Sequence, residues 1–259
     1  MIRKIFSRYN KPDFLIIGAQ KCGTTSLFHF LSQHPDLGLP TKKELHFFDL
    51  QYNKGIEWYY SLFPKKSFLK KKLTGEASPF YLFHSLVPER VFHHLPKIKI
   101  IVLLRNPIDR AYSQYNHQRK LGNEPIQSFE EAIVNEEGRI AAEEGKLKKG
   151  EINENLAYRR YSYVERGFYS VQIDRWLQYF SMNQMLFIKS EDFFEFPQKA
   201  LNEVYAFLKI SRILPHSLTP QNTNDYPLIN DSTRDLHGKI FKEDSEKLKD
   251  LLGEKFDWY

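Results

Sequence analysis

The chain reads Asp13-Phe-Leu-Ile-Ile-Gly18 near its start, and Ala-Gln-Lys21-Cys-Gly23-Thr24-Thr25-Ser26 follows directly. The first run is short, apolar and closed by glycine, which is typical of a buried parallel strand. Residues 24–33 then predict a helix that stops before Pro35, with an apolar side formed by Leu27, Phe28, Phe30 and Leu31. The stretch therefore predicts a strand, a tight loop and a helix, in that order.

The alternation of strands and helices continues along the chain. A second strand is expected near residues 73–77, and two later apolar runs predict strands over Lys99–Arg105 and over Gln184–Lys189. Helices are expected from Asp109, as N-cap, to Leu121, and over Pro197–Leu208. Such an order indicates an α/β fold in which helices cover both faces of a parallel sheet.

The length and composition set the domain organisation. A chain of 259 residues fits a single domain spanning residues 1–259, and 41% hydrophobic with 27% charged residues is a globular composition. Residues 122–165 are richly charged and weakly periodic, so we expect a helical insertion beside the sheet and not a separate domain. The net charge of +6 suits an anionic ligand, a polyanion or a membrane surface, and equally a solvated basic surface.

The single cysteine, Cys22, excludes an internal disulfide, so the fold needs no oxidising compartment. No run approaches the roughly 18 apolar residues of a membrane-spanning helix, and the basic start lacks the apolar segment of a signal peptide. We therefore expect a cytoplasmic protein without a transmembrane segment.

The loop after the first strand has the composition of a phosphate-binding loop. Small residues let backbone N–H groups approach a phosphate, and the start of the following helix adds partial positive charge. Lys21 supplies a full charge, while Thr24, Thr25 and Ser26 supply hydroxyl donors. The loop is P-loop-like, yet Thr24 stands where a nucleotide triphosphatase carries lysine, and Lys21 lies three positions earlier.

A second anion site is predicted at the end of the third strand. That strand ends in Arg105, whereas a triphosphatase ends a neighbouring strand in an aspartate that helps to hold Mg²⁺. Arg105 and Ser113, one turn into the next helix, offer a guanidinium and a hydroxyl at the edge where open α/β sheets bind ligands. The pattern predicts a nucleotide with two separated anionic ends and no required metal.

These residues resemble the sulfotransferases that use 3′-phosphoadenosine 5′-phosphosulfate (PAPS), most closely the heparan-sulfate-type branch and its bacterial relatives. Pro12–Ser26 looks like the family's 5′-phosphosulfate loop, and Ile101–Ser113 looks like its 3′-phosphate motif. Four further segments are similar to that branch: Lys43-Glu44-Leu-His46-Phe-Phe-Asp49, Gly75-Glu-Ala-Ser-Pro-Phe-Tyr81, Arg166-Gly-Phe-Tyr169 and Phe256-Asp-Trp258.

The resemblance implies a role for each candidate residue. The 5′-phosphosulfate would be held by Lys21, Cys22, Gly23, Thr24, Thr25 and Ser26, and the 3′-phosphate by Arg105 and Ser113. Transfer would be an in-line displacement that releases 3′-phosphoadenosine 5′-phosphate (PAP), with Lys21 stabilising the charge on the leaving group. Glu44 matches the catalytic base of the heparan-type enzymes, and His46 is the alternative base, because histidine titrates near neutral pH.

The acceptor stays open at this point. The heparan-type enzymes usually carry a lysine where this chain has Ala77, and they carry a disulfide-bounded loop and a basic triplet near the C-terminus, both of which this chain lacks. We expect an acceptor hydroxyl rather than an amine, on a carbohydrate or alternatively on a lipid or hydroxyacyl group, with residues 122–165 on the acceptor side. Nucleic acid is not expected as a partner, and the sequence does not indicate the oligomeric state.

Aromatic side chains near the proposed acceptor region could line its site or simply pack in the core: Trp58, Tyr59, Tyr60, Phe80, Tyr81 and Phe83. Two alternatives to a sulfotransferase also remain. A kinase or other triphosphatase is disfavoured by the positions of Lys21 and Arg105, and a nucleotide- or polyanion-binding module without catalysis would keep the loops but not a working Glu44.

Overall fold

The computed structural model describes residues 9–65, 72–148, 156–221 and 226–259. The chain divides into two compact units. The first contains Met1–Leu104 and Val171–Thr223, and the second contains Arg105–Ser170 and Asn224–Tyr259. The first holds the sheet, and the second is built from helices.

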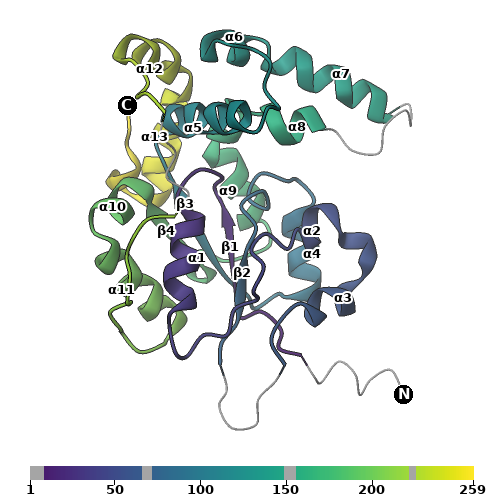
Figure 1. The fold of residues 1–259 in the computed structure, drawn as a ribbon, viewed down its shortest axis with the longest axis vertical. Coiled ribbons are helices and arrows are strands. Elements are labelled where there is room, and N and C mark those ends of the chain that lie inside the picture. The colour runs from purple at the N-terminus through teal and green to yellow at the C-terminus, as the bar shows by residue number, and fades with distance from the viewer. Residues whose placement is uncertain (1–8, 66–71, 149–155, 222–225) are drawn as a thin grey trace. The chain divides into compact units, whose positions relative to one another are not determined.

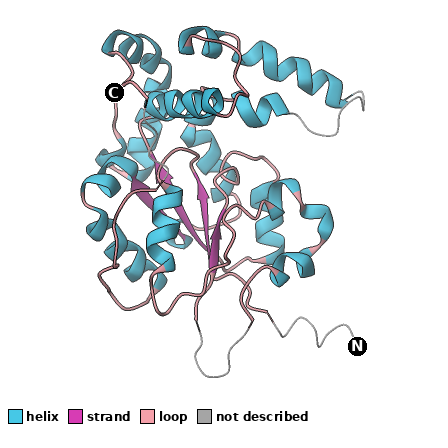
Figure 2. Ribbon diagram, in the orientation of Figure 1, coloured by secondary structure: helices cyan, strands magenta, loops and turns pink. Residues whose placement is uncertain are grey.

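A parallel sheet forms the centre of the first unit (Figure 2). Its strands follow the order β2-β1-β3-β4, and their bounds are β1 Phe14–Gly18, β2 Gly75–Ala77, β3 Lys99–Leu104 and β4 Met185–Lys189. Nearly every strand residue is buried, as expected where helices exclude water from a parallel sheet. All four predicted strands are confirmed.

Helices flank this sheet, with α1, α10 and α11 on the left of it in Figure 1 and α2, α3 and α4 on the right. Their bounds are α1 Thr24–Ser32, α2 Phe47–Leu50, α3 Ile56–Ser61, α4 Val87–His94, α10 Ser190–Glu195 and α11 Pro197–Leu208, while α9 covers Tyr169–Leu177. The four apolar residues expected on the inner side of α1 are all buried. The α/β fold with a parallel sheet flanked by helices is therefore confirmed.

The strands run parallel in register, so their carboxyl ends meet at one edge of the sheet. Ile16 of β1 is opposite Ala77 of β2, and Gly18 is opposite Val102 of β3. Beyond the end of β1, the N–H of Ala19 donates to the carbonyl of Leu103 at 2.6 Å. The loop that follows β1 is thus fastened to β3 at the edge where parallel sheets bind ligands.

The second unit packs its helices around an apolar cluster. The cluster contains Ile108, Ala111, Tyr115, Phe129, Ala132, Tyr163, Ile229 and Phe241. The helices are α5 Pro107–Lys120, α6 Phe129–Val134, α7 Glu136–Lys148, α8 Leu156–Tyr161, α12 Asp231–Gly238 and α13 Lys242–Leu252. Short 3-10 helices in the two units cover Tyr52–Lys54, Glu165–Gly167, Met182–Gln184, Lys239–Phe241 and Glu254–Phe256.

Two expectations about this region need comment. Residues 122–165 contain the helices α6, α7 and α8, with turns and coil over 122–128 and 162–164, while 149–155 lie outside the described residues. They share their compact unit with α5, α12 and α13. The assignment of residues 1–259 to one sulfotransferase domain, and of 122–165 to its acceptor side, stays a prediction.

The predicted N-cap of α5 is wrong. The helix begins at Pro107, and Asn106 is its N-cap, with the side-chain oxygen accepting the N–H groups of Ile108 at 3.1 Å and Asp109 at 3.3 Å. Proline suits the first helical position because the N–H that it lacks would have no partner inside the helix. Ser113 consequently lies nearly two turns into α5, further than the one turn expected.

Candidate functional site

The glycine loop between β1 and α1 has the geometry of an anion site. Gly23 is the N-cap of α1, with a left-handed φ of 93° and no side-chain cap. Helix geometry leaves the N–H groups of Thr24, Thr25 and Ser26 without a carbonyl four residues back inside the helix. The first bond of this kind runs from Leu27 N–H to the carbonyl of Gly23 at 3.0 Å. A group of N–H donors at the positive end of a helix suits a phosphate or a sulfate.

Contacts from elsewhere in the first unit support the loop. The Ser190 hydroxyl, just past β4, donates to the carbonyl of Cys22 at 3.0 Å. The buried Ser26 hydroxyl donates to the carbonyl of Gln221 at 3.3 Å and accepts its N–H at 2.9 Å. Ser26 therefore uses its hydroxyl to hold a neighbouring segment, and its N–H is the group suited to an anion. Cys22 is buried and free of any disulfide.

Glu44 and His46 form a charged cluster with two neighbours. The Nε2 atom of His46 lies 3.3 Å from Oε2 of Glu44, and its Nδ1 atom lies 2.7 Å from Oδ2 of Asp49. The Lys43 ammonium lies 2.8 Å from Oε1 of Glu44. The Asp49 side chain is fully buried, whereas 46% of the Glu44 side chain is exposed. The cluster thus runs from a buried carboxylate, through the imidazole, to a carboxylate that solvent can reach.

The pKa values follow from this arrangement. Desolvation opposes the charged form of His46, but its hydrogen bonds to Asp49 and Glu44 outweigh that effect and raise its pKa to about 9. Desolvation also opposes the ionisation of Glu44, but the bond from His46 and the charge of Lys43 outweigh it and lower its pKa to about 2. At neutral pH, His46 is an imidazolium and Glu44 a carboxylate.

Backbone strain marks the same residues. Among the described residues, four that are not glycine have a positive φ: Lys21 at 69°, Glu44 at 61°, His46 at 51° and Lys209 at 60°. Three of the four are predicted site residues. Left-handed backbone at residues other than glycine is uncommon and often accompanies functional sites, because the surrounding structure must hold it in place.

The charged cluster lies at the carboxyl end of β2. The N–H of Glu44 donates to the carbonyl of Ala77 at 3.0 Å, and the N–H of His46 donates to the Ser78 hydroxyl at 3.2 Å. β2 is the neighbour of β1, whose carboxyl end carries the glycine loop with Lys21. Within the first unit, the structure therefore brings Lys21, Glu44 and His46 to adjacent strand ends on one edge of the sheet.

Arg105 and Ser113 belong to the second unit, whereas the glycine loop belongs to the first. Arg105 is partly buried and follows β3 directly in the chain, and Ser113 is buried on α5. The carbonyl of Arg105 accepts a hydrogen bond from the Tyr169 hydroxyl at 2.9 Å. That bond restrains the backbone of the turn that leads from Arg105 into α5.

Two segments noted only for their resemblance support this turn. A side chain at Gly167 would meet Phe241 and Pro107, so only glycine lets the backbone pass there. The rings of Tyr169 and Trp258 lie 6.2 Å apart. Residues 166–169 and 256–258 therefore pack in the unit that holds the start of α5.

Asp49 and Glu76 are not among the site residues predicted from the sequence. The spacing of three residues between His46 and Asp49 was a usable signal, since side chains at i and i+3 meet on a helical turn. Glu76 carried no such signal. Of the six aromatic residues proposed for the acceptor side, five are buried, namely Tyr59, Tyr60, Phe80, Tyr81 and Phe83, and these belong to the packed core.

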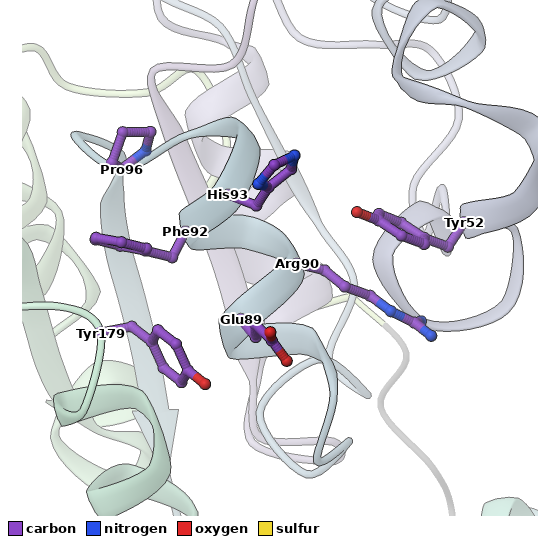
Figure 3. A pocket seen from close by; sticks show the side chains of 7 residues that line it. All are labelled: Tyr52, Glu89, Arg90, Phe92, His93, Pro96 and Tyr179. Carbon is purple, nitrogen blue, oxygen red and sulfur yellow. The ribbon is translucent and has the colours of Figure 1, made fainter.

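A surface pocket of about 880 Å³ lies elsewhere on the first unit (Figure 3). It is lined by Tyr52, Glu89, Arg90, Phe92, His93, Pro96 and Tyr179, and none of these is a predicted site residue. Arg90 stacks over the Tyr52 ring at 4.5 Å and donates to the carbonyl of Phe48 at 2.7 Å. Its guanidinium is therefore used to brace α2.

Across the described parts of the chain, no helix is long and apolar enough to cross a bilayer. In the same residues, no group of three or more histidine, cysteine or acidic side chains is arranged to hold a metal ion.

Comparison with known proteins decides the family. The sulfotransferase domain family matches residues 11–255. The chain belongs to this sulfotransferase family. The resemblance seen in the sequence is confirmed, and with it, at the level of the family, the prediction of an enzyme of this class.

The sulfotransferase has relatives in several organisms. It is 31% identical to a sulfotransferase from Alicyclobacillus acidocaldarius, whose crystal structure matches with a TM-score of 0.78 over 94% of this chain and 96% of that one. It is 37% identical to bifunctional heparan sulfate N-deacetylase/N-sulfotransferase 4 of Mus musculus over 79% of this chain, but spans only 23% of that protein. It is 27% identical to a membrane-associated sulfotransferase of Dictyostelium discoideum, over 95% of this chain and 66% of the relative.

Proposed function

We propose that this chain transfers a sulfuryl group from PAPS to an acceptor hydroxyl, with Glu44 as the base. The observation that carries the proposal is the ionised Glu44, held by His46 and Lys43 at the end of β2, beside the strand whose loop carries Lys21. An anion-binding loop and a carboxylate on adjacent strand ends are the two parts that the transfer of an anionic group to a hydroxyl requires.

The donor proposal rests on two cationic sites. The N–H groups of residues 24–26 and the Lys21 ammonium suit the 5′-phosphosulfate. Arg105 and Ser113 suit a 3′-phosphate, since guanidinium binds phosphate through paired hydrogen bonds. A donor with phosphate groups at both the 3′ and 5′ positions carries a group suited to each site, whereas ADP carries no 3′-phosphate for the second one.

The proposed reaction is a single displacement at sulfur. The acceptor oxygen forms a bond to sulfur while the bond between sulfur and the bridging phosphate oxygen breaks, and PAP leaves with that electron pair. The acceptor proton passes to Glu44. Lys21 and the loop N–H groups stabilise the charge that grows on the bridging oxygen, as in phosphoryl transfer.

Glu44 is better suited than His46 to receive the proton. Both ring nitrogens of His46 are engaged, by Glu44 and by Asp49, and its raised pKa of about 9 keeps it protonated at neutral pH. Glu44 is ionised, and almost half of its side chain is exposed. Its low pKa makes it a weak base for a free alcohol, but a hydroxyl becomes strongly acidic once its oxygen begins to bond to sulfur.

We propose a carbohydrate as the acceptor. The name of the Mus musculus relative supports this choice, because it specifies heparan sulfate, and its N-sulfotransferase activity keeps an amine as the alternative to a hydroxyl. The Dictyostelium relative is named as membrane-associated, so a lipid or hydroxyacyl acceptor also belongs in the test. A cytoplasmic location stays a prediction, which cell fractionation of the full-length protein would test.

The test is a transfer screen with PAPS labelled in its sulfuryl group. Oligosaccharides, glycolipids and hydroxyacyl carriers are supplied as acceptors, with wild type and Lys21→Ala compared side by side. We expect label on a carbohydrate with wild type only. If wild type binds PAP but labels no acceptor in the panel, a nucleotide-binding module is the better account.

A further inference from the structure

Glu76 is a carboxylate enclosed in the first unit. It directly precedes Ala77, whose carbonyl accepts the N–H of the candidate base Glu44. The Glu76 side chain lies in β2 and is completely buried. Three hydroxyls donate to it: Ser78 to Oε2 at 2.7 Å, and Tyr59 and Tyr81 to Oε1 at 3.0 and 2.9 Å. Burying a carboxylate is costly unless its oxygens are hydrogen-bonded, so this arrangement calls for a reason.

Two of the three hydroxyls also accept hydrogen bonds from backbone N–H groups beside the charged cluster. The Ser78 oxygen accepts the N–H of His46 at 3.2 Å. The Tyr81 oxygen accepts the N–H groups of Phe47 at 2.9 Å and Phe48 at 3.3 Å. Because each hydroxyl gives its proton to Glu76, its lone pairs are left to face these N–H groups. Among the described residues, the Tyr59 hydroxyl, by contrast, bonds to Glu76 alone.

These bonds replace the missing cap of α2. His46 is the N-cap of this helix, in a left-handed conformation and without a side-chain cap. The first N–H groups of a helix need acceptors from outside it. Here Ser78 and Tyr81 provide them, and Glu76 orients both hydroxyls.

The conformation of His46 decides what its ring can reach. The backbone at His46 has a φ of 51°, which is unfavourable for histidine and must be imposed by its surroundings. In that conformation the ring lies between Asp49 and Glu44 and bonds to both. A helix start that relaxed toward ordinary backbone angles would move the ring away from one or both carboxylates.

We propose that Glu76 is a positioning residue for Glu44 and His46, acting through the hydroxyls of Ser78 and Tyr81 on the start of α2. The proposal rests on the proposed function, in which Glu44 is the base. Glu76 does not touch the substrates; it fixes the loop that carries the base.

Tyr81→Phe and Tyr59→Phe form a matched pair that tests this. Both variants remove one hydroxyl that donates to the same oxygen of Glu76, and both keep the buried ring. Of the two tyrosine hydroxyls, only that of Tyr81 also accepts an N–H group of α2. We expect Tyr81→Phe to lower kcat by about 10-fold, the scale of one hydrogen bond, with PAP affinity unchanged, and Tyr59→Phe to keep kcat within about 2-fold.

A second readout does not depend on activity. The titration of the His46 ring is followed by NMR, with its signal assigned from the His46→Gln variant. Tyr81→Phe should shift the midpoint downward from about 9, because the ring loses its fixed approach to the two carboxylates, and Tyr59→Phe should leave it unchanged. Glu76→Gln, if it folds, should shift it in the same direction as Tyr81→Phe.

The two readouts separate the two proposals. If wild type transfers no sulfate, the proposed function fails, while the His46 midpoint still tests the positioning role. If the two tyrosine variants change kcat and the His46 midpoint equally, or if neither changes them, Glu76 is a structural carboxylate only and the inference is overturned.

Discussion

The Nε2 atom of His46 lies 3.3 Å from Oε2 of Glu44, so that the two groups proposed as alternative bases are partners in one ion pair. The pair gives them different roles. The imidazolium keeps the carboxylate ionised and oriented, and the carboxylate is left to receive a proton.

Replacing Glu44 tests the role of the base. Glu44→Gln should lower kcat by about 10²-fold or more, the usual scale for a general base, and should leave PAP affinity unchanged. Glu57→Gln, an exposed change on α3, is the control. Steady-state kinetics with labelled PAPS measures both. Full activity in Glu44→Gln would exclude it as the base and move the role to His46.

The loop cation is tested at Lys21. Lys21→Ala should reduce transfer by about 10²- to 10³-fold, the scale of one lost group in a site that stabilises transition-state charge. Alanine meets the same left-handed backbone as lysine, so the change removes the ammonium without easing that strain. Lys97→Ala, an exposed lysine before β3, should keep wild-type activity. Equal activity of the two variants would contradict the proposed role of the loop.

Arg105 is proposed to bind the 3′-phosphate. Arg105→Ala should weaken PAP binding by about 10- to 150-fold, the worth of a charged hydrogen bond, with a smaller effect on ADP. Lys120→Ala, which removes an exposed charge at the far end of α5, should change neither. Calorimetric titration measures the affinities of wild type and of both variants for PAP and for ADP. An equal loss for PAP and ADP would place the 3′-phosphate elsewhere.

The ion pair predicts a pH dependence of stability. The pKa of His46 is raised from 6.5 to about 9 in the folded chain, so its contribution is fully present below pH 6.5 and is lost as the pH rises through 9. The pKa of Glu44 is lowered from 4.5 to about 2, so its contribution is present above pH 4.5 and is lost as the pH falls through 2.

Urea unfolding of wild type and His46→Gln checks this dependence. The difference in the free energy of unfolding should be on the order of 1–3 kcal/mol at pH 6 and should shrink toward pH 10. A difference that stayed constant from pH 6 to 10 would show that His46 does not carry the charge assigned to it.

The cap of α5 gives a prediction about stability alone. Asn106→Ala should lower the free energy of unfolding by about 1 kcal/mol, because it removes the acceptor of two N–H groups. Asp109→Ala should cost less, because Asp109 forms only a partly exposed ion pair with Arg234. Thermal unfolding compares them. A larger loss in Asp109→Ala would restore Asp109 as the more important residue at this helix start.

Much of the fold could be predicted from local sequence patterns. β1, β3 and β4 are continuous apolar runs, and α11 begins and ends at the predicted residues. Gly18 closes β1, Pro107 follows β3, and Pro197 opens α11. The start of α5 was misread because both Asn106 and Asp109 are good caps, and only the fold shows which side chain faces the free N–H groups.

The candidate site was less readable. Lys21 and Glu44 were found from loop composition and resemblance. The hydrogen bonds that link Glu76 through Ser78 to His46, and through Tyr81 to Phe47, join β2 to a loop some thirty residues earlier. No sequence period links those positions. The ion pair between Glu44 and His46 likewise depends on left-handed backbone at both residues. Such backbone cannot be predicted from the sequence at residues other than glycine.

The most direct test of a donor with two anionic ends is thermal stabilisation of wild type by PAP and by ADP at equal concentrations. The account predicts a clearly larger rise in Tm with PAP, because PAP carries a 3′-phosphate that suits Arg105 and Ser113 as well as a 5′-phosphate that suits the loop of Lys21. An equal rise with both ligands, or a larger rise with ADP, would contradict the PAPS site.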